Sequence, residues 1–341
     1  MTDGKPHPIL KNYREVTRYP YFQEGRDGEP CLRPELKKRI RVIDMHAHLA
    51  WTYFFSKPIQ LFARSTAVHF LTMPDQRVSI NRYFYRDMTP RDALRFYRNT
   101  IASLWRSPQE NTYHTIPNLI DDMNRMGISR TVVLPIDLPF SRNSEILLKS
   151  TRGNSRIIPF CSLHPAMGHK ERRLKAFVRW GARGFKFHPV AMASPPDSTE
   201  AMKLFEVCAA IKLPVLTHTS STGIELGYMQ SCSKVKNFEE PVRAFPEIPF
   251  VLGHAGFREI DEIIRYCNEY PNAYLEISGQ PLSNIEKIIR ETPDHKIMFG
   301  SDWSWYHPAV PLLTVLIATE GDEELRDKFL YRNAARVLGE D

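Results

Sequence analysis

Short runs of β-branched and apolar residues recur along this chain from residue 41 onward, alternating with stretches whose apolar positions follow helical spacing. Eight of these runs have the length and composition of buried strands in a parallel sheet. They cover residues 41–46, 130–136, 156–163, 182–188, 213–218, 249–254, 272–278 and 295–302. Amphipathic segments such as 170–180, 199–211 and 257–270 lie between them, and Gly127 and Gly181 stand where two helices are expected to end. Eight strands alternating with helices predict a (β/α)8 TIM barrel.

A doubly wound open sheet is the competing architecture for the same alternation. In its dinucleotide-binding form that architecture carries a G-x-G-x-x-G motif after the first strand, and no such motif follows residues 41–46. We therefore expect the barrel, whose active site lies at the C-terminal ends of the strands.

Two segments do not follow the alternation. Residues 1–40 precede the first strand and are Pro-rich, basic and polar, so we assign them to an N-terminal arm without a predicted role. Residues 41–341 form the predicted barrel domain, and residues 50–115 form a long insertion after its first strand. Nine of the 35 residues from Trp51 to Tyr85 are aromatic. Because long insertions after barrel strands lie over the C-terminal mouth, we expect a lid or pocket wall; a satellite subdomain or a dimer contact is the alternative.

A helix from Pro90 to Trp105 is expected to close this insertion. Thr89 stands at the N-cap position, Pro90 at the first helical position and Asp92 in the first turn. Each residue type is favoured there, because the first turn of a helix has unpaired N–H groups and a positive dipole end.

Composition and charge narrow the class of protein. Of the 341 residues, 42% are apolar and 25% are charged, which is a globular composition with enough length for a large core. No apolar run approaches the roughly 20 residues that span a bilayer. The five cysteines are odd in number and form no C-x-x-C pair, so we expect reduced thiols in a cytoplasmic protein. The net charge of +7 is spread along the chain, which argues against a nucleic-acid partner.

Residues that suit metal chemistry stand at the ends of the predicted strands. His46 and His48 are two positions apart, so on a strand both side chains point the same way, and imidazole is the commonest metal ligand. Further candidates end the fourth, fifth, sixth and eighth strands, namely Lys186 with His188, His218, His254 and Asp302. Because the C-terminal ends of barrel strands converge, these side chains predict one metal site at the barrel mouth.

The motifs that contain these residues are DMHAH, GFKFHP, LTHTS, GHAG and GSDW. In order and spacing they resemble the amidohydrolase superfamily, most closely its TIM-barrel branch of the amidohydrolase-2 type that includes aminocarboxymuconate semialdehyde decarboxylase. The resemblance covers residues 41–341, including the terminal YRNAARVLG. It implies a (β/α)8 barrel with a divalent metal, usually zinc. The ligands it implies are His46, His48, His218 and Asp302, with a reactive His254 near the metal.

Roles for these residues follow from the implied ligand set. Three imidazoles and a carboxylate leave room on zinc for a water molecule, whose pKa falls toward about 7. Asp302 can take the proton of that water, and His254 can polarise the scissile group or stabilise a developing oxyanion. His188, Trp303 and His307 are expected to contact the substrate.

Other polar residues receive secondary assignments. We expect Asp44 to be a hydrogen-bond partner behind the ligands and Glu276 to be structural. The arginines of the insertion are candidates for a clamp on a substrate carboxylate; they are Arg64, Arg77, Arg82 and Arg86.

Lys186 is the residue whose chemical state stays open. A charged lysine on a buried strand face is costly unless it is paired or neutral. Its amine could be carboxylated and bridge two metals, as in two-metal members of the superfamily and in the urease segment that GFKFH resembles. It could instead remain an ammonium that pairs with Asp302 or with a substrate carboxylate, or it could project into solvent. We expect one metal ion per chain, and two if Lys186 is carboxylated.

Together these features predict a metal-dependent hydrolase in which metal-bound hydroxide attacks an amide, lactone or ester carbonyl of a small molecule. The alternative on the same site is a metal-dependent, non-oxidative decarboxylase of an aromatic or unsaturated carboxylate. Two further alternatives are a nuclease similar to the TatD-type barrels and a non-catalytic binding module on the same scaffold. A homo-oligomer is compatible with all of them.

Overall fold

The structure is a computed structural model that describes residues 7–50, 60–65, 69–86, 88–105, 114–221 and 227–340. Much of the aromatic start of the insertion, including Trp51, Tyr53, Phe54 and Phe55, lies outside the described residues.

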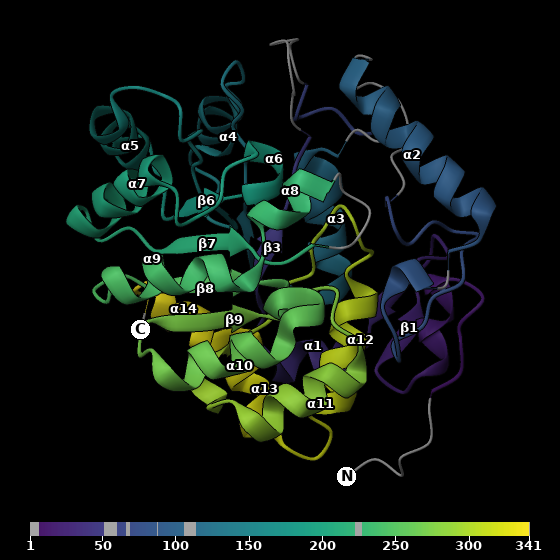
Figure 1. The fold of residues 1–341 in the computed structure, drawn as a ribbon. Coiled ribbons are helices and arrows are strands. Elements are labelled where there is room, and N and C mark those ends of the chain that lie inside the picture. Colours follow the sequence, from purple (N-terminus) through teal and green to yellow (C-terminus); the bar gives the residue numbers. More distant parts are fainter. Residues whose placement is uncertain are drawn as a thin grey trace.

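Eight short parallel strands of the described chain form the barrel, and each coincides with a run expected from the sequence, the first ending one residue beyond its run (Figure 1). They are β3 (Ile43–Ala47), β4 (Arg130–Val133), β5 (Ile157–Pro159), β6 (Phe185–Phe187), β7 (Val215–His218), β8 (Phe250–Gly253), β9 (Ala273–Glu276) and β10 (Ile297–Met298). Strands β3, β4 and β5 pair in one set, and β6 to β10 pair in sequence order in the other.

Backbone hydrogen bonds join the two sets of strands into a ring. Next to β5 and β6, the Cys161 N–H donates to the Gly184 carbonyl at 2.8 Å. On the other side, the Met45 N–H of β3 donates to the carbonyl of Phe299, just after β10, at 3.0 Å. These bonds close the ring, and the (β/α)8 barrel expected from the sequence is confirmed.

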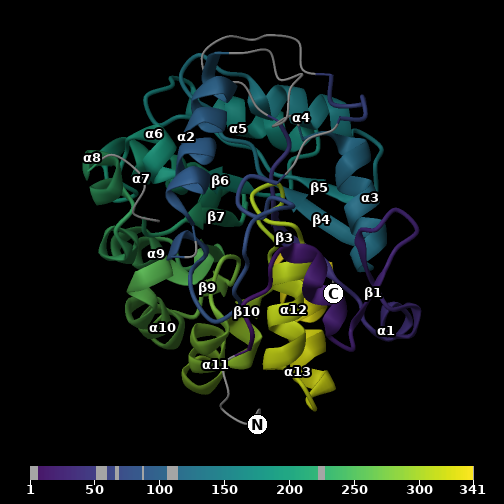
Figure 2. The same cartoon turned by 90° about the vertical axis from the view of Figure 1, so that its right-hand side faces the viewer.

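Helices surround the strands (Figures 1 and 2). The longer ones are α3 (Ile116–Met126), α4 (Asn143–Thr151), α5 (Lys170–Arg179), α7 (Thr199–Ala210), α10 (Ile260–Glu269), α11 (Leu282–Glu291) and α12 (Ala309–Ala318). Shorter ones are α6 (Pro189–Met192), α8 (Gly227–Cys232), α9 (Glu239–Ala244), α13 (Glu323–Asp327) and α14 (Asn333–Val337). In α10 the buried residues Ile260, Ile263, Ile264 and Cys267 follow helical spacing, which explains the face it turns to the barrel. Gly127 ends α3 at a φ of 69°, a left-handed conformation that suits glycine.

The interior of the barrel carries an apolar layer beneath its mouth. Val132, Leu216 and Val251 of the strands and Phe160, just after β5, belong to one buried cluster, separate from the core between strands and helices. Lys186 lies opposite Leu216 in the register of β6 and β7, and paired residues of neighbouring strands point to the same side of a sheet. The lysine therefore points into the barrel, while Phe185 and Phe187 pack in the outer core.

The N-terminal arm is folded and packs against the barrel. It contains a 3-10 helix η1 (Tyr13–Arg18), the hairpin strands β1 (Phe22–Glu24) and β2 (Pro30–Leu32), and α1 (Pro34–Arg39). The η1 segment packs on α12 and β2 packs on α3. The arm places five apolar side chains in the main core, namely Leu10, Tyr13, Val16, Phe22 and Leu32.

The described part of the insertion lies beside the arm and the loop after β10. Leu10 and Val78 exchange two backbone hydrogen bonds of 2.9 and 3.0 Å, which tie the arm to the insertion. The Leu71 N–H donates to the Trp305 carbonyl at 2.8 Å, which ties the insertion to the loop after β10. A short 3-10 helix, η2 (Phe84–Arg86), precedes α2 in the insertion.

The helix α2 (Pro90–Trp105) has the bounds expected from the sequence and lies outside the ring of barrel helices (Figure 1). Its start is a capping box. The Asp92 N–H donates to the Thr89 hydroxyl at 3.2 Å, and the Thr89 N–H donates to the Asp92 carboxylate at 3.0 Å.

Two expectations from composition can also be compared with the structure. The five cysteines are free thiols. Among the described residues, no helix has both the length and the apolar character that crossing a bilayer requires.

Candidate metal centre

Two histidines from β3 and an aspartate from the segment after β10 meet at the barrel mouth. The Nε2 atoms of His46 and His48 are 3.2 Å apart. The Oδ1 atom of Asp302 lies 3.7 Å from the His46 Nε2 and 3.6 Å from the His48 Nε2. Neighbouring ligand atoms of a tetrahedral zinc site, with bonds of about 2.0–2.1 Å, are about 3.4 Å apart. All three residues are buried, so three of the four expected ligands have the spacing that one ion requires.

Hydrogen bonds fix which nitrogen of each histidine carries the proton. The Nδ1 of His48 lies 2.8 Å from the Leu134 carbonyl oxygen, which can only accept, so Nδ1 carries the proton. The Nδ1 of His46 lies 2.7 Å from a carboxylate oxygen of Glu276, an arrangement typical of metal-ligating histidines. Both Nε2 atoms are therefore left with a lone pair directed at the Asp302 side.

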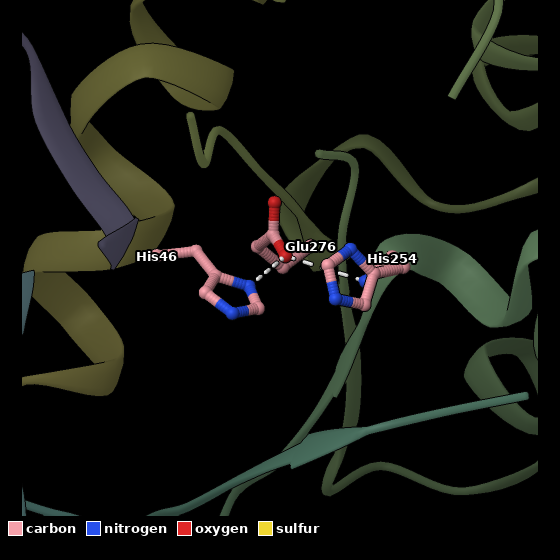
Figure 3. Close-up of side chains that lie close together, drawn as sticks. All are labelled: His46, His254 and Glu276. Carbon is pink, nitrogen blue, oxygen red and sulfur yellow. Dashed lines mark hydrogen bonds and ion pairs between the residues drawn. The ribbon is translucent and has the colours of Figure 1, made fainter. Parts of the chain in front are cut away.

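Glu276 also organises His254, which lies on its other side (Figure 3). The His254 backbone N–H donates to Oε2 of Glu276 at 3.3 Å. The Ser278 hydroxyl donates to the same oxygen at 2.9 Å and lies 2.8 Å from Nδ1 of His254. Since the hydroxyl proton goes to the carboxylate, the serine oxygen accepts from Nδ1–H, and Nε2 of His254 is an acceptor. Stabilising an oxyanion, as we expected of His254, would require this ring to take up a second proton.

The expected ligand His218 lies beside this group and is not part of it. The ligand atoms of His46, His48 and Asp302 are all within 4.8 Å of one another, and His218 does not belong to that set. Its ring is centred 4.6 Å from the ring of His254 and stacks on His188 at 4.2 Å. Its Nε2 is buried without a hydrogen-bond partner, as expected of a nitrogen reserved for a ligand.

Lys186 lies within the centre. Its side chain is fully buried, and its Nζ is 3.3 Å from the Nε2 of His46. Of the three states considered from the sequence, projection into solvent is therefore wrong. Burial lowers the pKa of Lys186 to about 7, against the attraction of Asp302 and Glu276. The contact with His46 does not distinguish an ammonium from a carboxylated amine, and both stay predictions.

Burial dominates the electrostatics of the centre. It lowers the pKa of His48 to about 3 and the pKa values of His46 and His254 well below the usual range, with Lys186 acting in the same direction. Neutral imidazoles, the form that binds metals, are thus the stable form at neutral pH. Burial raises the pKa of Asp302 well above its usual range, and Lys186 opposes this shift. A divalent ion among these groups would supply the positive charge that favours an ionised Asp302.

Two bends in the backbone present the reactive side chains. Asp302 has a φ of 53° and His254 a φ of 59°, a left-handed region that few residues other than glycine adopt. Such conformations cost free energy and concentrate at functional sites. They turn both residues off the ends of their strands and toward the interior of the barrel mouth.

The comparison with known families gives a match over most of the chain. The model of the amidohydrolase family matches residues 43–339. The chain belongs to the amidohydrolase family. A search of curated proteins found no match.

Solved structures similar to this amidohydrolase share its fold at low sequence identity. An uncharacterised TIM-barrel protein from Bordetella bronchiseptica is 17% identical, covers 88% of this chain and 99% of its own, and has a TM-score of 0.58. A probable 2-pyrone-4,6-dicarboxylic acid hydrolase from Acinetobacter baumannii, with citric acid bound, has 14% identity, coverage of 87% and 99%, and a TM-score of 0.55. A 5-carboxyvanillate decarboxylase from Novosphingobium aromaticivorans, complexed with manganese and a nitrobenzoic acid, has 14% identity, coverage of 88% and 96%, and a TM-score of 0.53.

The structure places two of the expected substrate contacts in another part of this amidohydrolase. The Trp303 indole donates to Asp122 at 2.8 Å, and the His307 ring stacks on Tyr13 at 4.3 Å. The left-handed bend at Asp302 and the bond to Asp122 direct the Trp303 ring away from the centre that Asp302 faces. The positions of Trp303 and His307 therefore do not support substrate contact, whereas His188 lies against His218 at the centre.

The arginine clamp suggested from the sequence is not formed by the described contacts. Arg64, Arg77, Arg82 and Arg86 are all exposed, and Arg64 pairs with Asp121 on the surface. Asp44 takes the expected supporting position, since its carboxylate accepts the N–H groups of His46 at 3.0 Å and Ser301 at 2.8 Å.

Sequence reasoning underestimated Glu276 and did not consider Ser278. Glu276 is fully buried at the end of β9 and contacts both His46 and His254. Its place at the C-terminal end of a barrel strand was the available signal, because the same rule identified His218 and Asp302.

Proposed function

We propose that this amidohydrolase binds one divalent metal at His46, His48 and Asp302, completed by His218, and hydrolyses an amide, lactone or ester carbonyl of a small molecule. The observation that carries the proposal is the 3.2–3.7 Å spacing of three buried donor atoms around one point. When bound, the metal supplies Lewis-acid polarisation and activates water for attack.

The residues around this point have separate roles in proton transfer, substrate contact and ligand orientation. Asp302 accepts the proton of the attacking water and returns it to the leaving group, a role suited to a buried carboxylate whose pKa is raised. His254 offers an unprotonated Nε2 that accepts a hydrogen bond from substrate or water, because Ser278 holds the proton on Nδ1. Glu276 holds the His46 ring in the orientation that turns Nε2 to the ion.

We further propose that the substrate carries a carboxylate. Lys186 supports a carboxylate substrate because its amine is buried at the centre, 3.3 Å from Nε2 of His46. A buried ammonium requires a negative counter-charge, which a substrate carboxylate would supply. The names of the similar structures point to the same class, since they refer to a pyrone dicarboxylic acid and a carboxylated vanillate.

Decarboxylation of an aromatic or unsaturated carboxylate is the second candidate. The observation that favours it is the raised pKa of Asp302, since a buried carboxylic acid can donate the proton that replaces the departing CO₂ on carbon. Lys186 would hold the carboxylate before it leaves.

Isotope labelling separates the two reactions. The zinc- or manganese-loaded protein is incubated with lactone and amide carboxylates and with hydroxybenzoates, in H₂¹⁸O and separately in D₂O. We expect ¹⁸O in a new carboxylate of the product, and at least a thousandfold loss of rate in Asp302→Asn. Release of CO₂ with deuterium on carbon and no ¹⁸O would replace the hydrolase by the decarboxylase. Turnover that survives complete metal removal would refute both.

A further inference from the structure

A second group of metal-type side chains lies outside the barrel mouth. His69 from the insertion, Asp122 from α3 and His307 from the loop before α12 place their ligand atoms within 4.8 Å of one another. Asp122 and His307 are buried and His69 is half-buried. Three segments far apart in the sequence therefore bring two imidazoles and a carboxylate to one point.

The spacing within this group is that of ligands around an ion. The Nε2 of His69 lies 3.5 Å from Oδ2 of Asp122. The Nε2 of His307 lies 3.8 Å from Oε2 of Glu29, which comes from the N-terminal arm. Ligand atoms of a tetrahedral zinc site are about 3.4 Å apart. Glu29 does not belong to the set within 4.8 Å, but it lies beside His307 and is the candidate for a fourth ligand.

The carboxylates of this group are held from behind. The Trp303 indole N–H and the Arg125 guanidinium each donate to Asp122 at 2.8 Å, one to each oxygen. The Tyr13 hydroxyl donates to Oε2 of Glu29 at 2.7 Å. Hydrogen bonds of this kind orient the ligands of metal sites.

The charges of the group leave room for a cation. Three carboxylates, of Asp122, Glu29 and Asp27, face two guanidiniums, of Arg125 and Arg14. The Nε2 of His69 faces Asp122, while its Nδ1 is buried without a hydrogen-bond partner among the described residues, so nothing in the described structure holds this ring in one tautomer. A cavity of about 330 Å³ reaches the group from the surface, lined by Tyr13, Glu29, His69, Asp122, Arg125 and His307.

We propose that His69, Asp122 and His307, completed by Glu29, form a second divalent-metal site, distinct from the centre at His46. Imidazole nitrogens with carboxylates select a transition ion such as zinc. The ion ties together the arm, the insertion, α3 and the loop after β10. Coordination through Nε2 moves the proton of His307 to Nδ1, so the 3.2 Å contact from the Ala309 N–H to that nitrogen opens when the ion binds.

Zinc stoichiometry tests this site on the full-length chain. Protein stripped with a chelator is reloaded with zinc, desalted, and its ions per chain are counted by elemental analysis and native mass spectrometry. We expect two ions in the wild type and one in His69→Gln. His46→Asn also lowers the count by one, and the double variant holds none. His295→Gln, at a half-exposed histidine that belongs to neither group, is the matched control and keeps both ions.

Asp122→Asn guards against a variant that fails to fold. It keeps an oxygen that accepts the Trp303 N–H, replaces the oxygen that accepts from Arg125 by an NH2 group, and removes the charge. It therefore also loses one ion, while its thermal unfolding without metal stays cooperative. A zinc count that is the same in wild type, His69→Gln and Asp122→Asn would overturn the second site. If Lys186→Met loses the second ion and His69→Gln keeps it, that ion belongs to the His46 centre. This result would also overturn the second site. If the His46 centre binds no metal and the second site does, the wild type holds one ion and His69→Gln holds none. This result would contradict the proposed metal centre and support the second site.

Discussion

Glu276 is the residue on which two histidines of the centre depend, because one carboxylate oxygen contacts both His46 and the backbone of His254. In Glu276→Gln the amide keeps the shape and loses the charge that polarises His46. We expect zinc to bind about 10- to 100-fold more weakly, the range found when such supporting groups are removed, as measured by competition with a chromogenic chelator.

Glu262→Gln is the matched control for this prediction, since Glu262 is exposed on α10. It should leave zinc affinity unchanged. Equal affinities in Glu276→Gln and wild type would mean that Glu276 supports the fold alone.

Asp137 gives a pH prediction away from both metal groups. It follows β4, accepts from the Ser144 N–H at 3.2 Å, and burial raises its pKa to about 6. Between about pH 4 and pH 6 the folded protein keeps a proton on Asp137 that the unfolded chain has lost. The free energy of unfolding therefore falls as pH rises through this window. Asp137→Asn does not titrate, so relative to wild type it should gain about 2–3 kcal/mol between pH 4 and pH 7.

Urea unfolding of both proteins at the two pH values measures this difference. A variant whose stability relative to wild type is the same at pH 4 and pH 7 would show that Asp137 titrates normally in the fold.

At the level of residues, the sequence predicted which side chains gather at the barrel mouth because position at a strand end is a local property. His46, His48, Lys186, His188, His218, His254 and Asp302 all came from that rule. It could not predict that Trp303 turns away, because this depends on the backbone bend at Asp302 and on the partner Asp122. The group around His69 joins residues from four separate segments, and no spacing in the sequence indicates it.

Gly300, just after β10, packs closely against Glu276 of β9 and His46 of β3. A Cβ atom at Gly300 would lie 2.2 Å from Oε1 of Glu276 and 2.8 Å from the Cβ of His46. Gly300→Ala should therefore destabilise the fold by about 1–3 kcal/mol, as overpacking does, and push Glu276 away from His46. Thermal unfolding and zinc affinity measure the two effects.

Gly168→Ala is the control at the same chemical change, since no described residue beyond its two chain neighbours lies within 4 Å of the position that its added methyl group would take. It should change neither quantity. Normal zinc binding in Gly300→Ala would show that Glu276 has space to move without releasing His46.

Elements were predictable where a periodic pattern covered them. All eight barrel strands and α2 lie where the pattern places them, and Thr89 and Asp92 form the expected cap. The segment before α10 is different. Residues 257–259, expected to be helical, belong to the 3-10 segment η4 (His254–Glu259), with Phe257 at a φ of 44°. The bend places His254 at the end of its strand, facing the barrel mouth. The tertiary structure therefore determines the backbone of this segment, and its local helical spacing does not.

At the scale of the whole molecule, the N-terminal arm is an integral part of the barrel's outer core. Five of its apolar side chains are buried there, and each contributes about 1.5–3 kcal/mol, which together rival the 5–15 kcal/mol by which a domain is stable. Deleting residues 1–33 should abolish cooperative unfolding and expose surface that binds a hydrophobic dye.

Ile9→Ala is the control in the full-length chain, because Ile9 is 43% exposed, and it should leave the melting temperature nearly unchanged. A truncated protein that melts like the full chain would show that the barrel is stable without its arm. The sequence could not predict that the arm is part of the core. Its composition is polar and Pro-rich, and turns separate its buried apolar residues, so they follow no helical or strand spacing.

Asp302 and Trp303 are consecutive residues that serve different groups, and this gives the protein an optical reporter between its two metal-type clusters. The Trp303 indole is fully buried and hydrogen-bonded to Asp122, while its neighbour faces the barrel mouth. Because indole emission responds to nearby charge, filling the Asp122 group changes its fluorescence directly, and filling the other centre changes it through the shared backbone. In a variant that keeps Trp303 and replaces the other four tryptophans, its fluorescence can then follow, in real time and without any substrate, the order in which the two positions are filled.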